Sequence, residues 1–258
     1  MLLAIDIGNT NTVFALCKDD AIAAHWRIST DHRRTADEYA VWLLSLMQLE
    51  KFSREDITQV AIASVVPDVI FNLKSLSRSM FNCEPLIIGN GAIELDMPVH
   101  IDNPRELGAD RLVNAYAAWN KHKKALIVID FGTATTFDVV SGKGEYLGGV
   151  IAPGVNLSLE ALQRAAARLH GIAIAHPDKV VGTNTTGAMQ SGIYFGYLAM
   201  IDGICERINA ETGMAPLVIA TGGLAPLYAS ASKTIALVDE DLTIEGIRLI
   251  ASRFPRKA

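Results

Sequence analysis

The chain has 258 residues, of which 50% are hydrophobic and 20% charged, so it is long enough to bury the cores of two modest domains. Its net charge of −5, with acids and bases interspersed, argues against a broad nucleic-acid-binding surface, and we expect no nucleic-acid partner. The three cysteines are widely separated and form no CxxC pair, so we expect buried, reduced thiols.

Charged residues interrupt every apolar stretch before it reaches the length of a membrane span, so no membrane partner is expected. The N-terminal apolar run has no basic region and is broken by Asp6, which is not the pattern of a signal peptide. We therefore expect a cytoplasmic protein.

The apolar start of the chain predicts a buried strand that ends in a polar turn. Asp6 arrives at the end of this strand, a common position for a carboxylate that acts through Mg²⁺ in a nucleotide site. Gly8 allows close backbone approach, and its neighbours offer N–H, amide and hydroxyl groups to phosphate oxygens. The residues of this turn and its flanks are Asp6, Ile7, Gly8, Asn9, Thr10, Asn11, Thr12 and Val13. One such turn is also compatible with a plain hairpin that binds nothing.

The segment that follows alternates between strand-like and helical patterns, which predicts an α/β sheet with helices on its faces. A polar loop of residues 27–35 contains three arginines and is expected to be solvated. Helices are predicted at residues 36–50 and 68–81, and strands at 59–66 and 85–89.

A predicted helix from Pro104 to about His122 carries Gly108, Ala109, Asp110 and Arg111 near its start. An exposed ion pair between Asp110 and Arg111 would contribute little. The position of the pair, at a loop-to-helix passage between two phosphate-binding motifs, favours a function. We place the domain boundary in this helix, dividing the chain into residues 1–112 and 113–258.

The first turn has a second copy after another apolar strand. Asp130 matches Asp6, Gly132 matches Gly8, and Thr136 matches Thr12. A third strand, near residues 217–221, ends in Gly222 and Gly223. Three such turns predict two duplicated lobes with a nucleotide in the cleft between them. Asn9–Thr12 and Gly132–Thr133 are then expected to hold the phosphate chain of this nucleotide, and the glycine pair to leave room for its adenosine.

The remaining segments predict helices at residues 156–169, 188–209 and 242–253 and a strand at 234–238. Gly192 and Gly196 lie four residues apart on the second of these helices, a spacing that permits close helix or subunit packing. Thr185 precedes it and is either a helix N-cap, which its spacing favours, or a ligand contact. No P-loop motif is present, which excludes that class of phosphotransferase.

These motifs, in this order, resemble those of type III pantothenate kinase, in the actin–hexokinase–Hsp70 superfamily. The residues that carry the resemblance are Asp6–Thr10, Asp102–Pro104, Gly108–Arg111, Asp130–Ala134, Asn184–Thr185 and Ala188–Gly192. The resemblance covers nearly the whole chain. It implies two actin/hexokinase-like (ribonuclease H-like) lobes and ATP-dependent phosphorylation of pantothenate to 4′-phosphopantothenate, the first step toward coenzyme A.

The resemblance also implies residue roles. Asp110 is expected to be the general base, and Gly108, Ala109, Arg111 and Thr185 to bind pantothenate with it. Asp6 through Val13 and Thr133 are expected to contact ATP, which binds with Mg²⁺. Asp130 is expected to hold the monovalent cation, K⁺ or NH₄⁺, and the family is dimeric, so a homodimer is expected.

One position departs from the family pattern, since Ile101 stands where many members have a tyrosine in the pantothenate pocket. Two other functions are compatible with the motifs. One is a superfamily kinase for a sugar or a small acid. The other is a regulatory, partner-binding role, because some members were first described as accessory factors in virulence-gene regulation. The presence of Asp6, Asp110 and Asp130 together favours retained catalysis.

Overall fold

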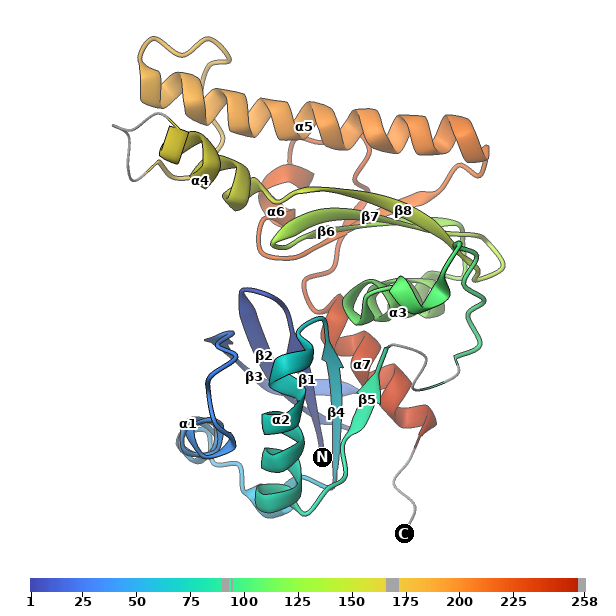
Figure 1. The fold of residues 1–258 in the computed structure, drawn as a ribbon. Coiled ribbons are helices and arrows are strands. Elements are labelled where there is room, and N and C mark those ends of the chain that lie inside the picture. The colour runs from blue at the N-terminus through green and yellow to red at the C-terminus, as the bar shows by residue number, and fades with distance from the viewer. Residues whose placement is uncertain (90–92, 94, 166–171, 255–258) are drawn as a thin grey trace. The chain divides into compact units, whose positions relative to one another are not determined.

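The computed structural model describes residues 1–89, 93, 95–165 and 172–254 (Figure 1). Its contacts divide this part of the chain into two compact units. The first unit comprises Met1–Asp96, Asp102–Ala117 and the C-terminal helix α7 (Leu242–Arg253), and the second comprises Met97–Ile101 and Ala118–Asp241. The chain-order division into residues 1–112 and 113–258 stays a prediction.

The first unit is a five-stranded sheet of order β3-β2-β1-β4-β5. Its strands are β1 (Leu2–Ile7), β2 (Asn11–Lys18), β3 (Ala21–Ser29), β4 (Gln59–Ser64) and β5 (Leu86–Ile88). Its helical segments are α1 (Ala36–Leu49), α2 (Pro67–Phe81), the first part of α3 (Ala109–His122), α7, and two 3₁₀ turns at Arg54–Asp56 and Pro104–Glu106.

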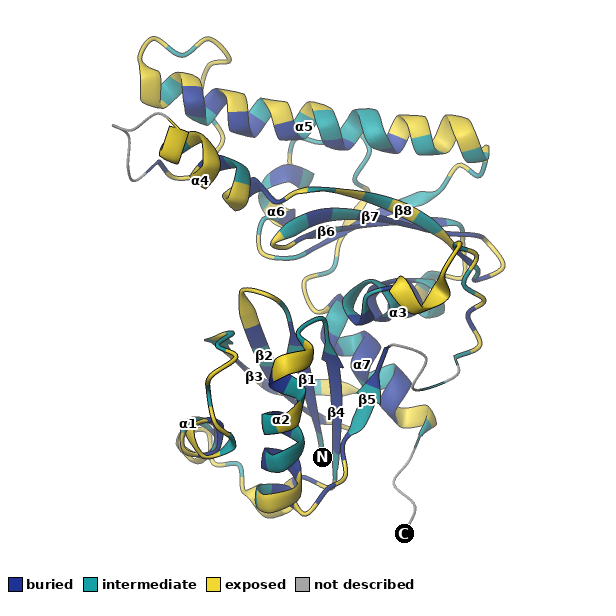
Figure 2. Cartoon of the chain, in the orientation of Figure 1, coloured by how far each residue is buried: buried dark blue, intermediate teal, exposed yellow. Residues whose placement is uncertain are grey.

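The two faces of this sheet are covered by different helices. Leu3, Ile5 and Ile7 alternate along β1, so they point to one face, where they join a core with the buried residues of α1 and α2. Helix α7 instead contacts β1 and β4. Figure 2 shows β1 and β4 coloured as buried along most of their length.

The second unit is a five-stranded sheet of order β10-β9-β6-β7-β8. Its strands are β6 (Leu126–Phe131), β7 (Ala134–Val140), β8 (Tyr146–Pro153), β9 (Leu217–Thr221) and β10 (Leu237–Val238). Its helices are the end of α3, α4 (Val155–Ala165), α5 (Thr185–Thr212) and α6 (Ala225–Ala229). The last residues of the helix predicted at 156–169 lie outside the described residues.

The core of the second unit joins one face of its sheet to α4, α5 and α6. Phe131 of β6 stacks on Tyr228 of α6, with ring centroids 5.2 Å apart. Tyr228 in turn stacks on Tyr194 of α5, at 5.4 Å. The residue between Asp130 and Gly132 is therefore anchored by an aromatic stack, which holds the end of β6 in place.

The duplication predicted from the repeated turn is confirmed by the topology of the two sheets. Strands β1, β2, β3, β4 and β5 correspond to β6, β7, β8, β9 and β10. In each sheet the first strand pairs antiparallel with the second and parallel with the fourth. Asp6 and Asp130 therefore occupy the same position, near the carboxyl end of the central strand of their own unit.

Local signals account for the ends of several elements. Helix α1 begins with a capping box in which Thr35 and Glu38 satisfy each other's backbone N–H groups. Cys17, Cys83 and Cys205 are buried and form no disulfide with one another, as predicted, and burial raises the pKa of Cys17 and of Cys205 to about 11. Across the described ranges, no helix combines the length and the apolar character that a bilayer span requires.

Candidate active site

The first polar turn joins β1 to β2 and is closed by a hydrogen bond from Gly8 N to Asn11 O, at 3.0 Å. Asn9, Thr10 and Asn11 are exposed at its tip, whereas Thr12 is fully buried. The turn thus presents polar groups to a ligand from a rigid base. This arrangement suits a phosphate-binding turn.

The Gly108–Arg111 segment lies beside the carboxyl end of β1, within the first unit. Val65, just after β4, donates its backbone N–H to Ile7 O at 3.1 Å. A Cβ on Gly108 would lie 3.5 Å from Cγ1 of the same Val65. One residue therefore links the turn that follows Ile7 to the segment that carries Asp110. The carboxyl ends of parallel strands are where ligands bind in open α/β sheets.

The Asp110 carboxylate is held close to the backbone of its own segment. Oδ1 accepts a hydrogen bond from Arg111 N at 2.7 Å, and a Cβ on Gly108 would lie only 2.6 Å from it. Position 108 therefore requires glycine while the carboxylate keeps this orientation. Burial raises the pKa of Asp110 above its usual range, and the N–H and charge of Arg111 partly offset that effect. A carboxylate in this environment is a stronger base than one in water.

The second polar turn joins β6 to β7 in the second unit. Gly132 N donates to Ala134 O at 3.0 Å, and Gly154 N donates to Thr133 O at 3.1 Å. A Cβ on Gly154 would lie 2.2 Å from Thr133 O, so position 154 can support the turn in this way only when it is glycine. This contact joins residues 21 positions apart, and no local signal in the sequence predicts it.

The registers of the two hairpins correct the match between Thr12 and Thr136. Thr12 pairs with Ile7, whereas it is Thr135 that pairs with Phe131. Thr135 is therefore the counterpart of Thr12, and both are fully buried. The match was wrong because the second turn is one residue shorter than the first, which an alignment on the glycines does not reveal.

The two glycines after β9, Gly222 and Gly223, have different surroundings. Gly222 has φ +89°, and a Cβ there would lie 2.7 Å from Phe131 O and 2.8 Å from Asp130 Oδ1. A carboxylate oxygen and a carbonyl oxygen thus converge on the space that a side chain at Gly222 would fill. Apart from the chain neighbours of Gly223, no heavy atom of the described residues lies within 4 Å of its Cβ position. Only the first glycine is dictated by close packing.

Thr185 is exposed in the first turn of α5 and is not the N-cap, so that prediction was wrong. The cap is Asn184, whose side chain accepts a hydrogen bond from Gly187 N at 2.8 Å. The spacing predicted the wrong cap because Asn184, Thr185 and Thr186 are adjacent and each is an acceptable N-cap residue. The other interpretation of Thr185, a ligand contact, stays a prediction.

Within the described ranges, no three His, Cys, Asp or Glu side chains converge to hold a metal ion. A Mg²⁺ ion that also binds nucleotide phosphates needs only one or two carboxylates from the protein. The single carboxylate of Asp6 at the end of β1 fits that requirement.

Ile101, the position that departs from the family pattern, is partly buried in the second unit. A Cβ on Gly148 of β8 would lie 3.7 Å from its Cγ2. Ile101 therefore packs on the edge strand β8 as an apolar side chain, without the hydroxyl that a tyrosine would supply.

The whole chain is similar to proteins of one family. Residues 2–207 match the family model described as type III pantothenate kinase. The type III pantothenate kinase of Paramagnetospirillum magneticum is 54% identical over 98% of this chain and 97% of its own length. That of Rhodospirillum rubrum is 53% identical, with 98% of each chain covered.

A solved structure shares the fold at low identity. A glucokinase of the ROK family from Streptomyces griseus, in complex with glucose and AMPPNP, has a TM-score of 0.56 and 12% identity, with 98% of this chain and 99% of that chain covered. The likeness supports the actin/hexokinase-like fold that the resemblance implies. The family model and the relatives of about 50% identity lead to one conclusion: this chain belongs to the type III pantothenate kinase family.

Proposed function

We propose that this protein transfers the γ-phosphoryl group of ATP to the hydroxyl of pantothenate, giving 4′-phosphopantothenate in the first step of coenzyme A synthesis. The proposal rests on its family and on one observation above all. A partly buried carboxylate, Asp110, lies in a segment that Val65 ties to the end of β1, beside the turn that carries Asp6.

Asp110 is the proposed general base. Phosphoryl transfer needs a positioned nucleophile and neutralised charge, together with a group that accepts the proton of the attacking hydroxyl. In this proposal the Asp110 carboxylate takes that proton as the oxygen attacks the phosphorus, and ADP leaves. Gly108, Ala109, Arg111 and Thr185 are the proposed contacts to pantothenate.

The residues proposed to form the ATP site are Asp6, Ile7, Gly8, Asn9, Thr10, Asn11, Thr12, Val13, Thr133, Gly222 and Gly223. The exposed tip of the first turn supports contact with phosphate oxygens. Mg²⁺, which accompanies ATP and neutralises phosphate charge, is assigned to Asp6. Thr12 is fully buried, which supports a role for it inside the turn rather than direct contact with the nucleotide.

A monovalent cation, K⁺ or NH₄⁺, is proposed at Asp130. The support is chemical, because Asp130 Oδ1 and Phe131 O converge beside Gly222 and hard cations prefer oxygen ligands. Replacing K⁺ with Na⁺ in the assay buffer is expected to lower kcat, and Asp130→Asn is expected to remove the difference between the two ions. Initial rates at constant ionic strength measure both effects. Equal rates in K⁺, Na⁺ and a buffer without either ion would remove the cation from this site.

We also propose a homodimer formed through α5. Gly192 and Gly196 are exposed, and no described heavy atom lies within 4 Å of either Cβ position. Such a face permits close approach of a second helix. Light scattering of the purified chain tests the proposal, and a mass equal to the 27.8 kDa of one chain would contradict it.

A further inference from the structure

The first polar turn is hydrogen-bonded to Thr30, a residue that lies outside it. Thr30, just after β3, donates its backbone N–H to Thr10 O at 2.9 Å and its hydroxyl to Gly8 O at 2.7 Å. Its Oγ1 also lies 2.9 Å from the hydroxyl of Thr12. Because the Thr30 proton is used on Gly8 O, Thr12 must be the donor in that contact. One threonine thus bonds three residues of the turn.

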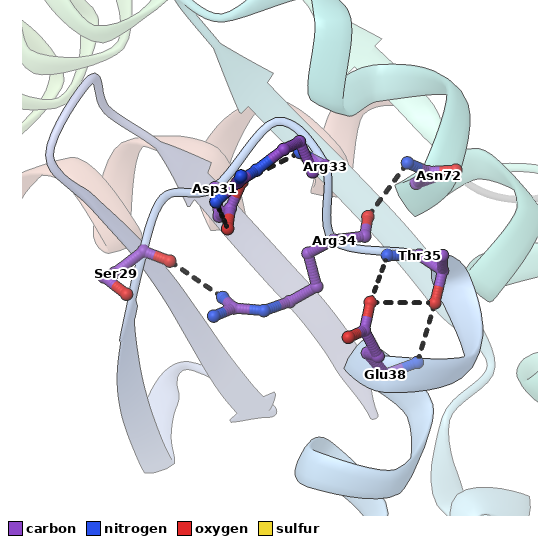
Figure 3. Close-up of polar contacts among 7 residues, drawn as sticks. All are labelled: Ser29, Asp31, Arg33, Arg34, Thr35, Glu38 and Asn72. Carbon is purple, nitrogen blue, oxygen red and sulfur yellow. Dashed lines mark hydrogen bonds and ion pairs between the residues drawn. The ribbon is translucent and has the colours of Figure 1, made fainter.

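The segment that carries Thr30 is itself fixed to the helices of the first unit (Figure 3). Arg34 donates to Ser29 O at 2.8 Å, and Arg34 O accepts a hydrogen bond from Asn72 of α2 at 2.9 Å. The capping box of Thr35 and Glu38 then begins α1. The segment that carries Thr30 is therefore tied by hydrogen bonds to the end of β3 and to α2, so Thr30 can restrict the movement of the first turn.

The contacts of this segment also explain its charges. The Asp31 carboxylate accepts hydrogen bonds from Arg33, which holds the pKa of Asp31 at about 2. Arg33 and Arg34 are thus engaged within the segment, as expected of a solvated loop. Thr30, the loop residue whose side chain contacts the first turn, carries no charge.

The second unit shows that the fold alone does not require this brace. Thr135, the counterpart of Thr12, is also fully buried, but its hydroxyl has no hydrogen-bond partner among the described residues. That turn is supported instead through the backbone of Thr133 by Gly154. The hydroxyl pair of Thr12 and Thr30 is specific to the first turn.

We propose that Thr30 is a positioning residue for ATP, an inference that rests on the proposed role of the first turn in phosphate binding. By engaging the carbonyl oxygens of Gly8 and Thr10, Thr30 keeps both turned toward β3. Carbonyl oxygens directed at the ligand would repel phosphate oxygens. The braced turn offers its donors to the phosphates without first having to reorganise, which preserves affinity.

Two variants at this position separate the hydroxyl from the shape of the side chain. Thr30→Val keeps the branched shape and the backbone N–H but leaves Gly8 O and the Thr12 hydroxyl without their partner. We expect it to raise the KM for ATP by about tenfold, the size of effect that follows from the loss of one or two hydrogen bonds. The KM for pantothenate is expected to change much less. Thr30→Ser keeps the hydroxyl and is expected to stay near the wild type.

Initial-rate kinetics in both substrates and calorimetric titration with a non-hydrolysable ATP analogue measure these effects. An unchanged KM for ATP in Thr30→Val would overturn the inference. Equal losses in Thr30→Ser and Thr30→Val, or a lowered melting temperature with no selective change in ATP affinity, would also overturn it, because they would assign Thr30 to stability alone.

Asp6→Asn separates this inference from the proposed function. If Asp6→Asn weakens ATP binding and Thr30→Val does not, the turn binds ATP and only the role of Thr30 falls. If Asp6→Asn leaves ATP affinity unchanged, the assignment of the turn falls, and the inference about Thr30 falls with it.

Discussion

Asp110→Asn is expected to lower kcat by roughly 10²- to 10⁴-fold, the usual contribution of a positioned general base. Asparagine keeps the size of the side chain and an oxygen that can accept from Arg111 N, but it cannot take the proton of a substrate hydroxyl. ATP affinity is expected to be largely unchanged, because the proposed ATP contacts lie elsewhere. Turnover measurements and titration with an ATP analogue test the two parts separately. Near-normal turnover would remove Asp110 from the role of base.

The raised pKa of Asp110 leads to two further expectations, one for the pH dependence of wild-type activity and one for the melting temperature of Asp110→Asn. The base acts only when ionised, so the activity of the wild type is expected to fall with decreasing pH through a pKa above the ordinary aspartate value of about 3.9. The folded carboxyl also binds its proton more tightly than the unfolded one, so ionisation destabilises the fold, and the cost is fully present above the folded pKa.

Asp110→Asn is therefore expected to melt at neutral pH no lower than the wild type. A large drop in its melting temperature would show that the lost turnover reflects misfolding rather than a missing base.

Gly222→Ala is expected to damage both the fold and the proposed cation site. The new Cβ would lie 2.7 Å from Phe131 O and 2.8 Å from Asp130 Oδ1, at a residue with φ +89°. Strain of this kind costs about 1–3 kcal/mol, and relief of the overlap would move the Asp130 carboxylate. We expect lower stability to denaturant, reduced kcat and loss of the response to K⁺.

Gly223→Ala is the matched control, since in the described part of the chain no heavy atom beyond its chain neighbours lies within 4 Å of its Cβ position. It is expected to keep nearly the stability of the wild type. If the two variants are equally stable in denaturant titration, the close packing of Gly222 against Asp130 does not constrain this position.

The sequence predicted what depends on local pattern. Strand, turn and glycine recur around Asp6 and Asp130, and that repetition was enough to predict two equivalent sheets, which the shared strand order confirms. The helix predicted at residues 36–50 is confirmed as α1, whose start is fixed by the local capping box of Thr35 and Glu38. The roles given to Asp6, Asp110 and Asp130 stay predictions, supported by where the structure places these residues within their own units.

What depends on distant contacts could not be predicted. Thr30 lies 18 residues after Thr12, in a loop that contains three arginines. Only the antiparallel pairing of β2 with β3 brings the hydroxyls of Thr12 and Thr30 together. The support of Thr133 by Gly154 likewise follows from the pairing of β7 with β8. At Thr185, three adjacent residues could each have capped the helix, and local pattern could not choose between them.

The most direct test of the proposed function is the rate of ADP release from ATP in the presence of Mg²⁺ and K⁺, measured with and without pantothenate. We expect ADP release to depend on pantothenate and to be lost in Asp110→Asn. Release that proceeds only with a sugar or another small acid would contradict the assigned substrate. No release with any acceptor, from a protein that still binds ATP, would contradict the kinase function itself and favour a regulatory role.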